Sequence, residues 1–296
     1  MRRSSRFHPY PVWTPYVFLA PFLGVFVVFL VYPLFQSILL AMQQTFGPQH
    51  HEFVFLYNFI QLMQDPMFWK ALSNTALFAA ASVFLQMPLS LGLALLMNRP
   101  DVRGRAFFRL VFFSPALVGA VFVGVMFAII FQKRTGLLNI ILHELIGFNL
   151  DFPWLQVYVM PALILASLWM WTGFNMIYFL AALQNVDHDL MDAARIDGAG
   201  PWQRFLNVVL PAIRPIAGFV VLLSMIGSFQ LFELPYLLLN NSAGPENKGL
   251  TIVMYLYQTG FDTGDLGYAS AIGWALAVIL IGLSIVQRRL SRSEAF

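Results

Sequence analysis

The sequence lacks cysteine and has few charged side chains. With no cysteine in 296 residues, disulfides and thiolate metal sites are excluded. Charged residues make up 10% of the chain and apolar residues 59%, whereas soluble proteins typically have about 25% and about 45–50%. A water-soluble domain of this length needs more charge to cover its surface, so the composition predicts a membrane protein. The chain also has no G-x-x-x-x-G-K-[ST] phosphate-binding loop, and we do not expect it to hydrolyse ATP by itself.

Long charge-free intervals recur along the chain. A helix needs about 20 apolar residues to cross the hydrocarbon core, and its backbone groups must bond internally there, so each interval is expected to be helical. The first interval is longer than the roughly 7–15-residue core of a signal peptide and is expected to be a retained span. The six expected spans are about 13–37, 72–97, 108–131, 156–183, 213–239 and 267–287. The sequence thus predicts an all-α polytopic membrane protein, with a transmembrane domain over 13–287 between tails 1–12 and 288–296.

The basic residues predict the orientation of these spans, because segments on the cytoplasmic side are enriched in Lys and Arg. With the N-terminus inside, 13 of the 17 basic residues fall in cytoplasmic segments, and all of them are arginine: Arg2, Arg3, Arg6, Arg99, Arg103, Arg105, Arg109, Arg195, Arg204, Arg214, Arg288, Arg289 and Arg292. Only four fall outside: Lys70, Lys133, Arg134 and Lys248. Both termini are therefore expected in the cytoplasm.

The cytoplasmic loop at 186–212, between the fourth and fifth expected spans, is polar and rich in glycine. Residues 189–196 can form about two turns of helix. Gly198 and Gly200 permit a sharp bend, and Pro201 is well placed to start a second short helix. Such a helix–bend–helix at the membrane face suits contact with another protein. An ordinary connector between two spans is the alternative.

The loop resembles the EAA segment of ATP-binding-cassette (ABC) importer permeases. The matching residues are Asp192-Ala193-Ala194, Asp197-Gly198-Ala199 and Leu210-Pro211. Other stretches are similar to the carbohydrate-uptake branch of the family, which includes the membrane subunits of maltose and glycerol-phosphate transporters. These are Tyr57-Asn58-Phe59, Asp65-Pro66-Met67-Phe68-Trp69, Asn74-Thr75, Gly104-Arg105-Ala106-Phe107-Phe108-Arg109, Ser114-Pro115 and Gly267-Tyr268-Ala269-Ser270-Ala271. The sequence departs from the motif at Asp192, where the family has Glu.

The resemblance implies a type I ABC importer permease fold in the inner or plasma membrane of a prokaryote, and a transport subunit rather than an enzyme. The first short helix of the loop would dock on an ATPase subunit, with Asp192 pairing with a cation there. Implied partners are a second homologous permease, two ABC ATPase subunits, an extracytoplasmic solute-binding protein and a sugar of one to several units. No cofactor is expected on this chain, because the ATPases bind ATP and Mg. Membrane lipid is an expected contact and nucleic acid is not.

Polar residues inside two expected spans suggest a substrate pathway, because such groups are costly in lipid and usually face a cavity or a partner helix. Apart from Arg109 and Arg214 at the span ends, Glu233 is the one charge within the six spans, and Gln230 is expected one turn earlier on the same helix face. Trp171, Phe174 and Asn175 share an i, i+3, i+4 stripe on the fourth span. Aromatic faces beside amide and carboxylate groups suit a sugar. Packing between helices remains the alternative for the two rings, and an interhelical hydrogen bond for the two polar residues.

The residues support two other possibilities, an ion-coupled carrier and a metal site, less well. An ion-coupled secondary transporter using Glu233 would be expected to show several intramembrane ionisable groups and inverted repeats, whereas the spans contain one such group and no clear repeat. His50-His51 has no carboxylate or third histidine at ligand spacing, so no metal site is expected.

Overall fold

The computed structural model describes residues 11, 13–45 and 51–293. The expected N-terminal tail with Arg2, Arg3 and Arg6, the residue His50 and the end of the C-terminal tail lie outside these residues. The expected helical membrane architecture is confirmed. Five segments of the described chain are helical and apolar for long enough to cross a membrane, and a bent pair of helices would make a sixth.

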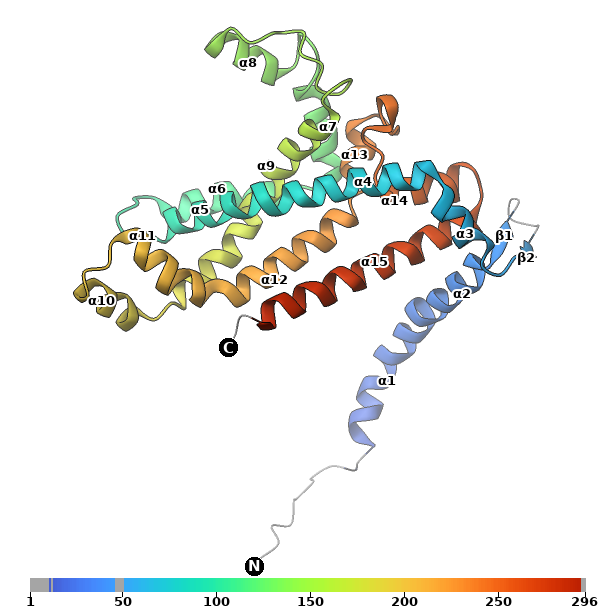
Figure 1. The fold of residues 1–296 in the computed structure, drawn as a ribbon, viewed down its shortest axis with the longest axis horizontal. Helices are drawn as coiled ribbons and strands as arrows, with labels where there is room; N and C mark the ends of the chain where they lie inside the picture. The colour runs from blue at the N-terminus through green and yellow to red at the C-terminus, as the bar shows by residue number, and fades with distance from the viewer. Residues whose placement is uncertain (1–10, 12, 46–50, 294–296) are drawn as a thin grey trace, which may run out of the picture.

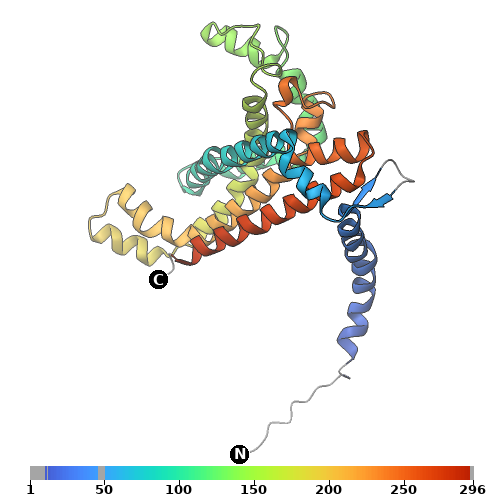
Figure 2. The ribbon, with the colours of Figure 1, turned by 45° about the vertical axis from the view of Figure 1, so that its right-hand side comes forward.

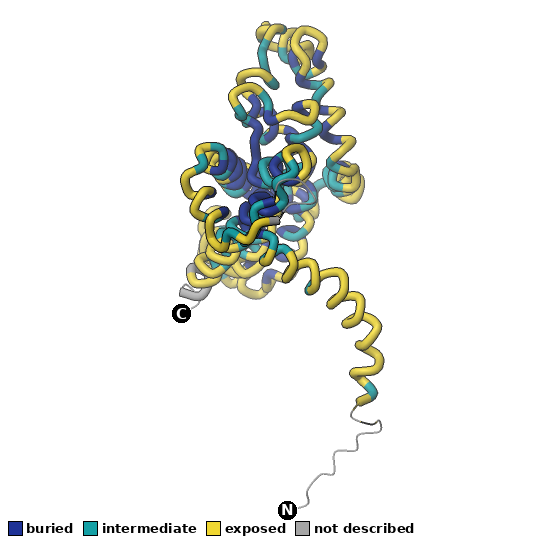
Figure 3. The backbone as a smooth tube through the Cα atoms, turned by 90° about the vertical axis from the view of Figure 1, so that its right-hand side faces the viewer, coloured by how far each residue is buried: buried dark blue, intermediate teal, exposed yellow. Residues whose placement is uncertain are grey.

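The first span stands apart from the others (Figures 1 and 3). It joins α1 (Thr14–Phe26), a π-helical turn η1 (Val27–Val31) and α2 (Tyr32–Ala41). Its most apolar stretch has no buried residue, and the span meets the bundle through α2, which packs against the start of α15. Two short antiparallel strands follow, β1 (Gln43–Thr45) and β2 (His51–Phe53), with Gln44 opposite Glu52.

Three helical segments form most of the bundle around the central helix α9 (Val159–Gln184). The best-buried of these, residues 66–98, packs along α9 through its last helix, α5. The segments are α4 (Pro66–Ala81) with η2 (Ser82–Gln86) and α5 (Met87–Asn98), then α11 (Pro201–Arg204) with η4 (Phe205–Val209) and α12 (Leu210–Phe229), and finally α15 (Leu266–Ser293). The carboxylate of Asp65 caps the start of α4 by accepting from the Met67 N–H at 2.8 Å, and Pro66 occupies the first helical position, where its missing N–H is harmless. More than half of the most apolar stretch of α9 is buried inside the protein.

The third expected span, 108–131, is not one helix. It consists of α6 (Arg105–Phe113), a 3-10 turn η3 (Ser114–Leu117) and α7 (Ala120–Ile130), and the two parts meet at 97°. Val118 and Gly119 between them have extended backbone. Hydropathy marks the whole interval as apolar, but it does not register a break that the surrounding protein stabilises.

The fifth expected span, 213–239, is also broken, and the prediction that Gln230 and Glu233 share a helix face is wrong. α12 ends at Phe229, Gln230 is its C-cap, and α13 (Glu233–Leu238) starts a separate helix after a break at Leu231–Phe232. The freed carbonyl of Leu231 accepts a hydrogen bond from the Thr251 hydroxyl at 2.6 Å. A side chain thus satisfies the backbone that the broken helix leaves open, as a membrane interior requires.

The remaining elements gather at the two ends of the bundle (Figure 1). One end carries the α5–α6 connection, α10 (His188–Ile196), α11 and the C-terminal part of α15. The opposite end carries α3 (Tyr57–Gln64), α8 (Leu137–Ile146), α13, η5 (Pro245–Asn247), α14 (Ile252–Tyr257) and η6 (Gln258–Asp262). The arginines at 99–109, 195–214 and 288–289 therefore share one end of the molecule.

Candidate functional site

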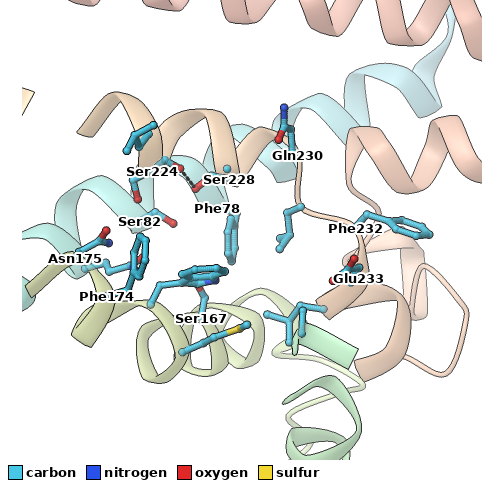
Figure 4. A pocket seen from close by; sticks show the side chains of 18 of the residues that line it. Phe78, Ser82, Ser167, Phe174, Asn175, Ser224, Ser228, Gln230, Phe232 and Glu233 are labelled. Carbon is cyan, nitrogen blue, oxygen red and sulfur yellow. Dashed lines mark hydrogen bonds between the residues drawn. The ribbon is translucent and has the colours of Figure 1, made fainter. Parts of the chain in front are cut away.

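A cavity of about 560 Å³ lies between α4–η2, α9 and the α12–α13 break (Figure 4). Its aromatic lining residues are Phe78, Trp171, Phe174 and Phe232. Its polar lining residues are Ser82, Gln86, Ser167, Asn175, Ser224, Ser228, Gln230 and Glu233. Aromatic rings and hydrogen-bonding groups thus both line a space large enough for a small organic ligand.

The structure brings all five residues of the predicted substrate pathway to this cavity. Trp171, Phe174 and Asn175 come from one face of α9, as their spacing predicts. The Trp171 and Phe174 rings meet edge-on with centroids 5.7 Å apart, and Phe113 of α6 stacks on Phe174 at 6.4 Å. Packing therefore fixes Phe174 in place, while Trp171 keeps 39% of its surface exposed.

The polar groups lie at separate parts of the cavity (Figure 4). Ser82 and Asn175 lie together beside Phe174, whereas Glu233 and Phe232 lie at the opposite side. Gln230 lines the cavity but its side chain points away from the other labelled residues. Among the described lining residues Glu233 carries the only charge. The cavity therefore presents one carboxylate and otherwise neutral polar groups.

Sequence reasoning missed the contribution of the second span. Ser82 and Gln86 form the ends of the π-helical turn η2 and line the same cavity. Both are polar residues inside an apolar interval and both are buried, at 5% and 2% exposed. Their polarity was the signal that could have identified them, by the same reasoning that identified Gln230 and Glu233.

The predicted helix–bend–helix is present at the end of the bundle (Figure 2). The Asp187 carboxylate caps α10 by accepting from the Asp189 N–H at 2.8 Å. At the other end of α10, Gly198 adopts φ +79°, a left-handed conformation that favours glycine. The N–H groups of Gly198 and Ala199 bond back to the carbonyls of Arg195 and Ala194 at 3.1 and 2.9 Å. These two bonds form a Schellman cap, which stops α10 and turns the chain toward α11.

The bend exposes most of the predicted coupling residues. Asp192, Ala193 and Asp197 are exposed, while Ala194 and Ala199 are half-buried. Leu210 and Pro211 directly follow η4, at the start of α12, and are exposed. Asp192 pairs with Arg195 at 2.7 Å within the helix, and both side chains are about 60% exposed. Such an exposed ion pair is weak, so the Asp192 carboxylate can exchange Arg195 for another cation.

A second polar cluster, at the opposite end of the bundle, was not anticipated. The Asp65 carboxylate accepts from the hydroxyls of Tyr255 on α14 and Tyr268 on α15, the latter at 2.7 Å. Burial and the neighbouring carboxylate raise the pKa of Tyr255 above its usual value, so this phenol stays a donor. The cluster joins α4, α14 and α15, and no sequence pattern links its three residues.

Comparison with known proteins agrees with the geometry. A family model described as "Binding-protein-dependent transport system inner membrane component" matches residues 86–294. The arabinooligosaccharides transport system permease protein of Bacillus subtilis is 38% identical, over 94% of this chain and 88% of its own length. The lactose transport system permease protein of Rhizobium radiobacter is 33% identical over 96% of both chains. A chain from the crystal structure of a bacterial ABC transporter for the acidic polysaccharide alginate has a TM-score of 0.84 at 24% identity, covering 96% of both chains, which shows the same fold.

These matches support an ABC importer permease over the ion-coupled carrier. They also agree with a transport subunit rather than an enzyme, in a multi-pass inner-membrane protein. This chain belongs to the family of inner membrane components of binding-protein-dependent transport systems, as a permease subunit of an ABC importer.

Proposed function

We propose that the chain crosses the membrane six times with both termini in the cytoplasm. The bent pair α6–α7 then counts as the third span, and an even number of spans returns the chain to its starting side. The gathering of the arginine-rich segments at one end of the bundle supports this orientation, because cytoplasmic segments are rich in arginine. The α10–α11 segment lies at that same end.

α10 is proposed to dock on a cytoplasmic ATPase subunit. Its exposed face carries Asp192 and Ala193, and Ile196 at its end is 87% exposed. The small Ala193 permits close approach of a partner, and the apolar Ile196 loses water on docking. The Asp192 carboxylate can exchange Arg195 for a cation of the partner. Motion of the ATPases would then be transmitted through α11 and η4 into α12, because these elements form one continuous helical segment.

The cavity is proposed to hold a neutral sugar during transport. The CH faces of a sugar stack on aromatic rings such as Trp171, and its hydroxyls bond to uncharged groups such as Asn175 and Ser82. The carboxylate of Glu233 accepts from hydroxyls but repels an anionic sugar, and the described lining offers no cation to offset it. The lining therefore favours the neutral sugars named for the sequence relatives over an acidic one.

The complete importer is proposed to contain a second, homologous permease, two ABC ATPase subunits and an extracytoplasmic sugar-binding protein. The first span supports the second permease, since its most apolar stretch has no buried residue and leaves a long apolar helix beside the bundle with a surface to cover. ATP and Mg would bind to the ATPases. This chain would supply the pathway and the docking segment, and it would bind no cofactor.

The observation that carries this proposal is the neutral polar and aromatic lining of the cavity with its single carboxylate. We would purify the complete importer, reconstitute it in proteoliposomes and measure ATP hydrolysis with arabinooligosaccharides, lactose or alginate oligosaccharides as substrate. A neutral sugar is expected to stimulate hydrolysis and to accumulate inside, and the alginate oligosaccharide is not. Stimulation by the acidic sugar alone, or by none of the panel, would contradict the proposal.

A further inference from the structure

One buried amide in the cavity wall lacks a hydrogen-bond partner. Gln86 is 2% exposed and lines the cavity, and its Nε2 forms no hydrogen bond in the structure. A buried amide N–H without a partner is destabilising, and the large majority of buried polar groups are paired. Gln86 therefore needs an explanation beyond packing.

The backbone of Gln86 is held firmly although its amide is not. The Ser90 hydroxyl lies 2.8 Å from the Gln86 carbonyl and 3.0 Å from the Thr172 carbonyl of α9, so it ties the two helices together at this point. Gln86 also ends the π-helical turn η2, and π-helical turns in longer helices are frequent at functional sites. The same turn begins at Ser82, which lies beside Asn175 in the cavity. A fixed backbone thus holds Gln86, with its unpaired buried amide, in the wall of the cavity.

The group that would satisfy this amide is an oxygen acceptor. Glu233 lies at the other side of the cavity, and its carboxylate is not beside Ser82 and Asn175. The last side-chain torsion of glutamine is broad and soft, so the amide can turn toward the cavity without moving the helix. A sugar hydroxyl placed against Asn175 would bring such an oxygen to the wall.

We propose that Gln86 is a specificity-determining residue, whose Nε2 donates a hydrogen bond to one hydroxyl oxygen of the transported sugar at the Ser82–Asn175 side of the cavity. The inference rests on the proposed sugar substrate. It adds a residue from the second span to a site that sequence reasoning placed on the fourth and fifth. The buried donor is unpaired in the structure and becomes paired when the sugar binds.

The test compares Gln86→Leu with the wild-type importer in proteoliposomes. The substrate is the neutral sugar of the panel that the wild type transports best, together with its set of monodeoxy analogues. Gln36→Leu is the matched control, because Gln36 lies on α2, away from the cavity, and its amide bonds to Tyr32. Transport rates and the melting temperature of the complex are measured for each variant.

The expected result is a loss of about three- to tenfold in transport of the parent sugar, as for one neutral hydrogen bond. One deoxy analogue should be transported equally by wild type and Gln86→Leu, because it lacks the oxygen that Gln86 contacts. The melting temperature should not fall, since leucine removes an unpaired group. Equal losses for every analogue, a lower melting temperature or unchanged transport of the parent sugar would overturn the inference. Unchanged transport would indicate that the Gln86 amide donates to a trapped water and not to the sugar. If the wild type transports no neutral sugar, the proposed function fails instead.

Discussion

Replacing Gly198 by valine should uncouple this permease from its ATPases without unfolding it. The left-handed backbone at φ +79° disfavours a side chain by about 1–2 kcal/mol, and a β-branched one more. If the chain leaves that conformation, it loses the two cap bonds to Arg195 and Ala194, worth about 0.5–1.5 kcal/mol each. Either route disfavours the bent form by about 2 kcal/mol, which shifts its population about 30-fold.

The loss should stay local, because a Cβ added at Gly198 meets no atom within 4 Å and the loop is exposed. We expect ATP-driven uptake in proteoliposomes to fall at least about tenfold, with less ATPase retained on the purified permease and an unchanged melting temperature of the transmembrane bundle.

Two variants in the same loop serve as controls. Gly200 has φ −66°, and a methyl group there finds its nearest neighbour at 3.8 Å, so Gly200→Ala should transport normally. Gly198→Asn should retain most activity, because asparagine tolerates the left-handed conformation better than other side chains. If Gly198→Val takes up sugar as fast as Gly200→Ala, the cap does not position the coupling helix and the reasoning is refuted.

Three further variants probe the bundle and the cavity. Gly173→Ala would place a methyl group against the Phe112 carbonyl and should destabilise the permease by about 1–3 kcal/mol. Gly227→Ala, in open space on the cavity wall, should not destabilise it. Thermal unfolding in detergent distinguishes the two variants. Asp65→Asn replaces the acceptor of two tyrosine hydroxyls by an amide and should cost about 2 kcal/mol in the same assay, and an unchanged melting temperature would count against that cluster. Glu233→Gln should raise uptake of an acidic relative to a neutral sugar about tenfold, and an unchanged ratio would make Glu233 structural.

Local signals in the sequence predicted the helix–bend–helix of the 186–212 loop in detail. The polar interval at 189–196 predicted α10, Gly198 predicted the bend, and Pro201 predicted the start of α11. All three follow from backbone rules that act within a few residues, so tertiary structure was not needed to see them. The fourth-span stripe of Trp171, Phe174 and Asn175 was equally local.

The breaks in two spans could not be predicted in the same way. Hydropathy over 108–131 and 213–239 reports which residues are apolar, but a broken helix in a membrane depends on distant groups that satisfy its free backbone. For α12–α13 that group is the Thr251 hydroxyl, 20 residues away from the Leu231 carbonyl that it bonds. The Asp65 cluster joins residues about 190 positions or more apart and likewise exists only in the folded chain.

Site-specific cross-linking tests the central claim most directly, that α10 rests on an ATPase and couples it to the transport pathway. The chain has no cysteine, so Ala193→Cys on the exposed face of α10 would be its only thiol. In the complete importer treated with a bifunctional thiol–amine reagent, this thiol is predicted to form a cross-link to an ATPase subunit, while Phe261→Cys, 69% exposed at the opposite end of the bundle, forms none. Cross-linking of the ATPase to position 261 and not to position 193 would contradict the account.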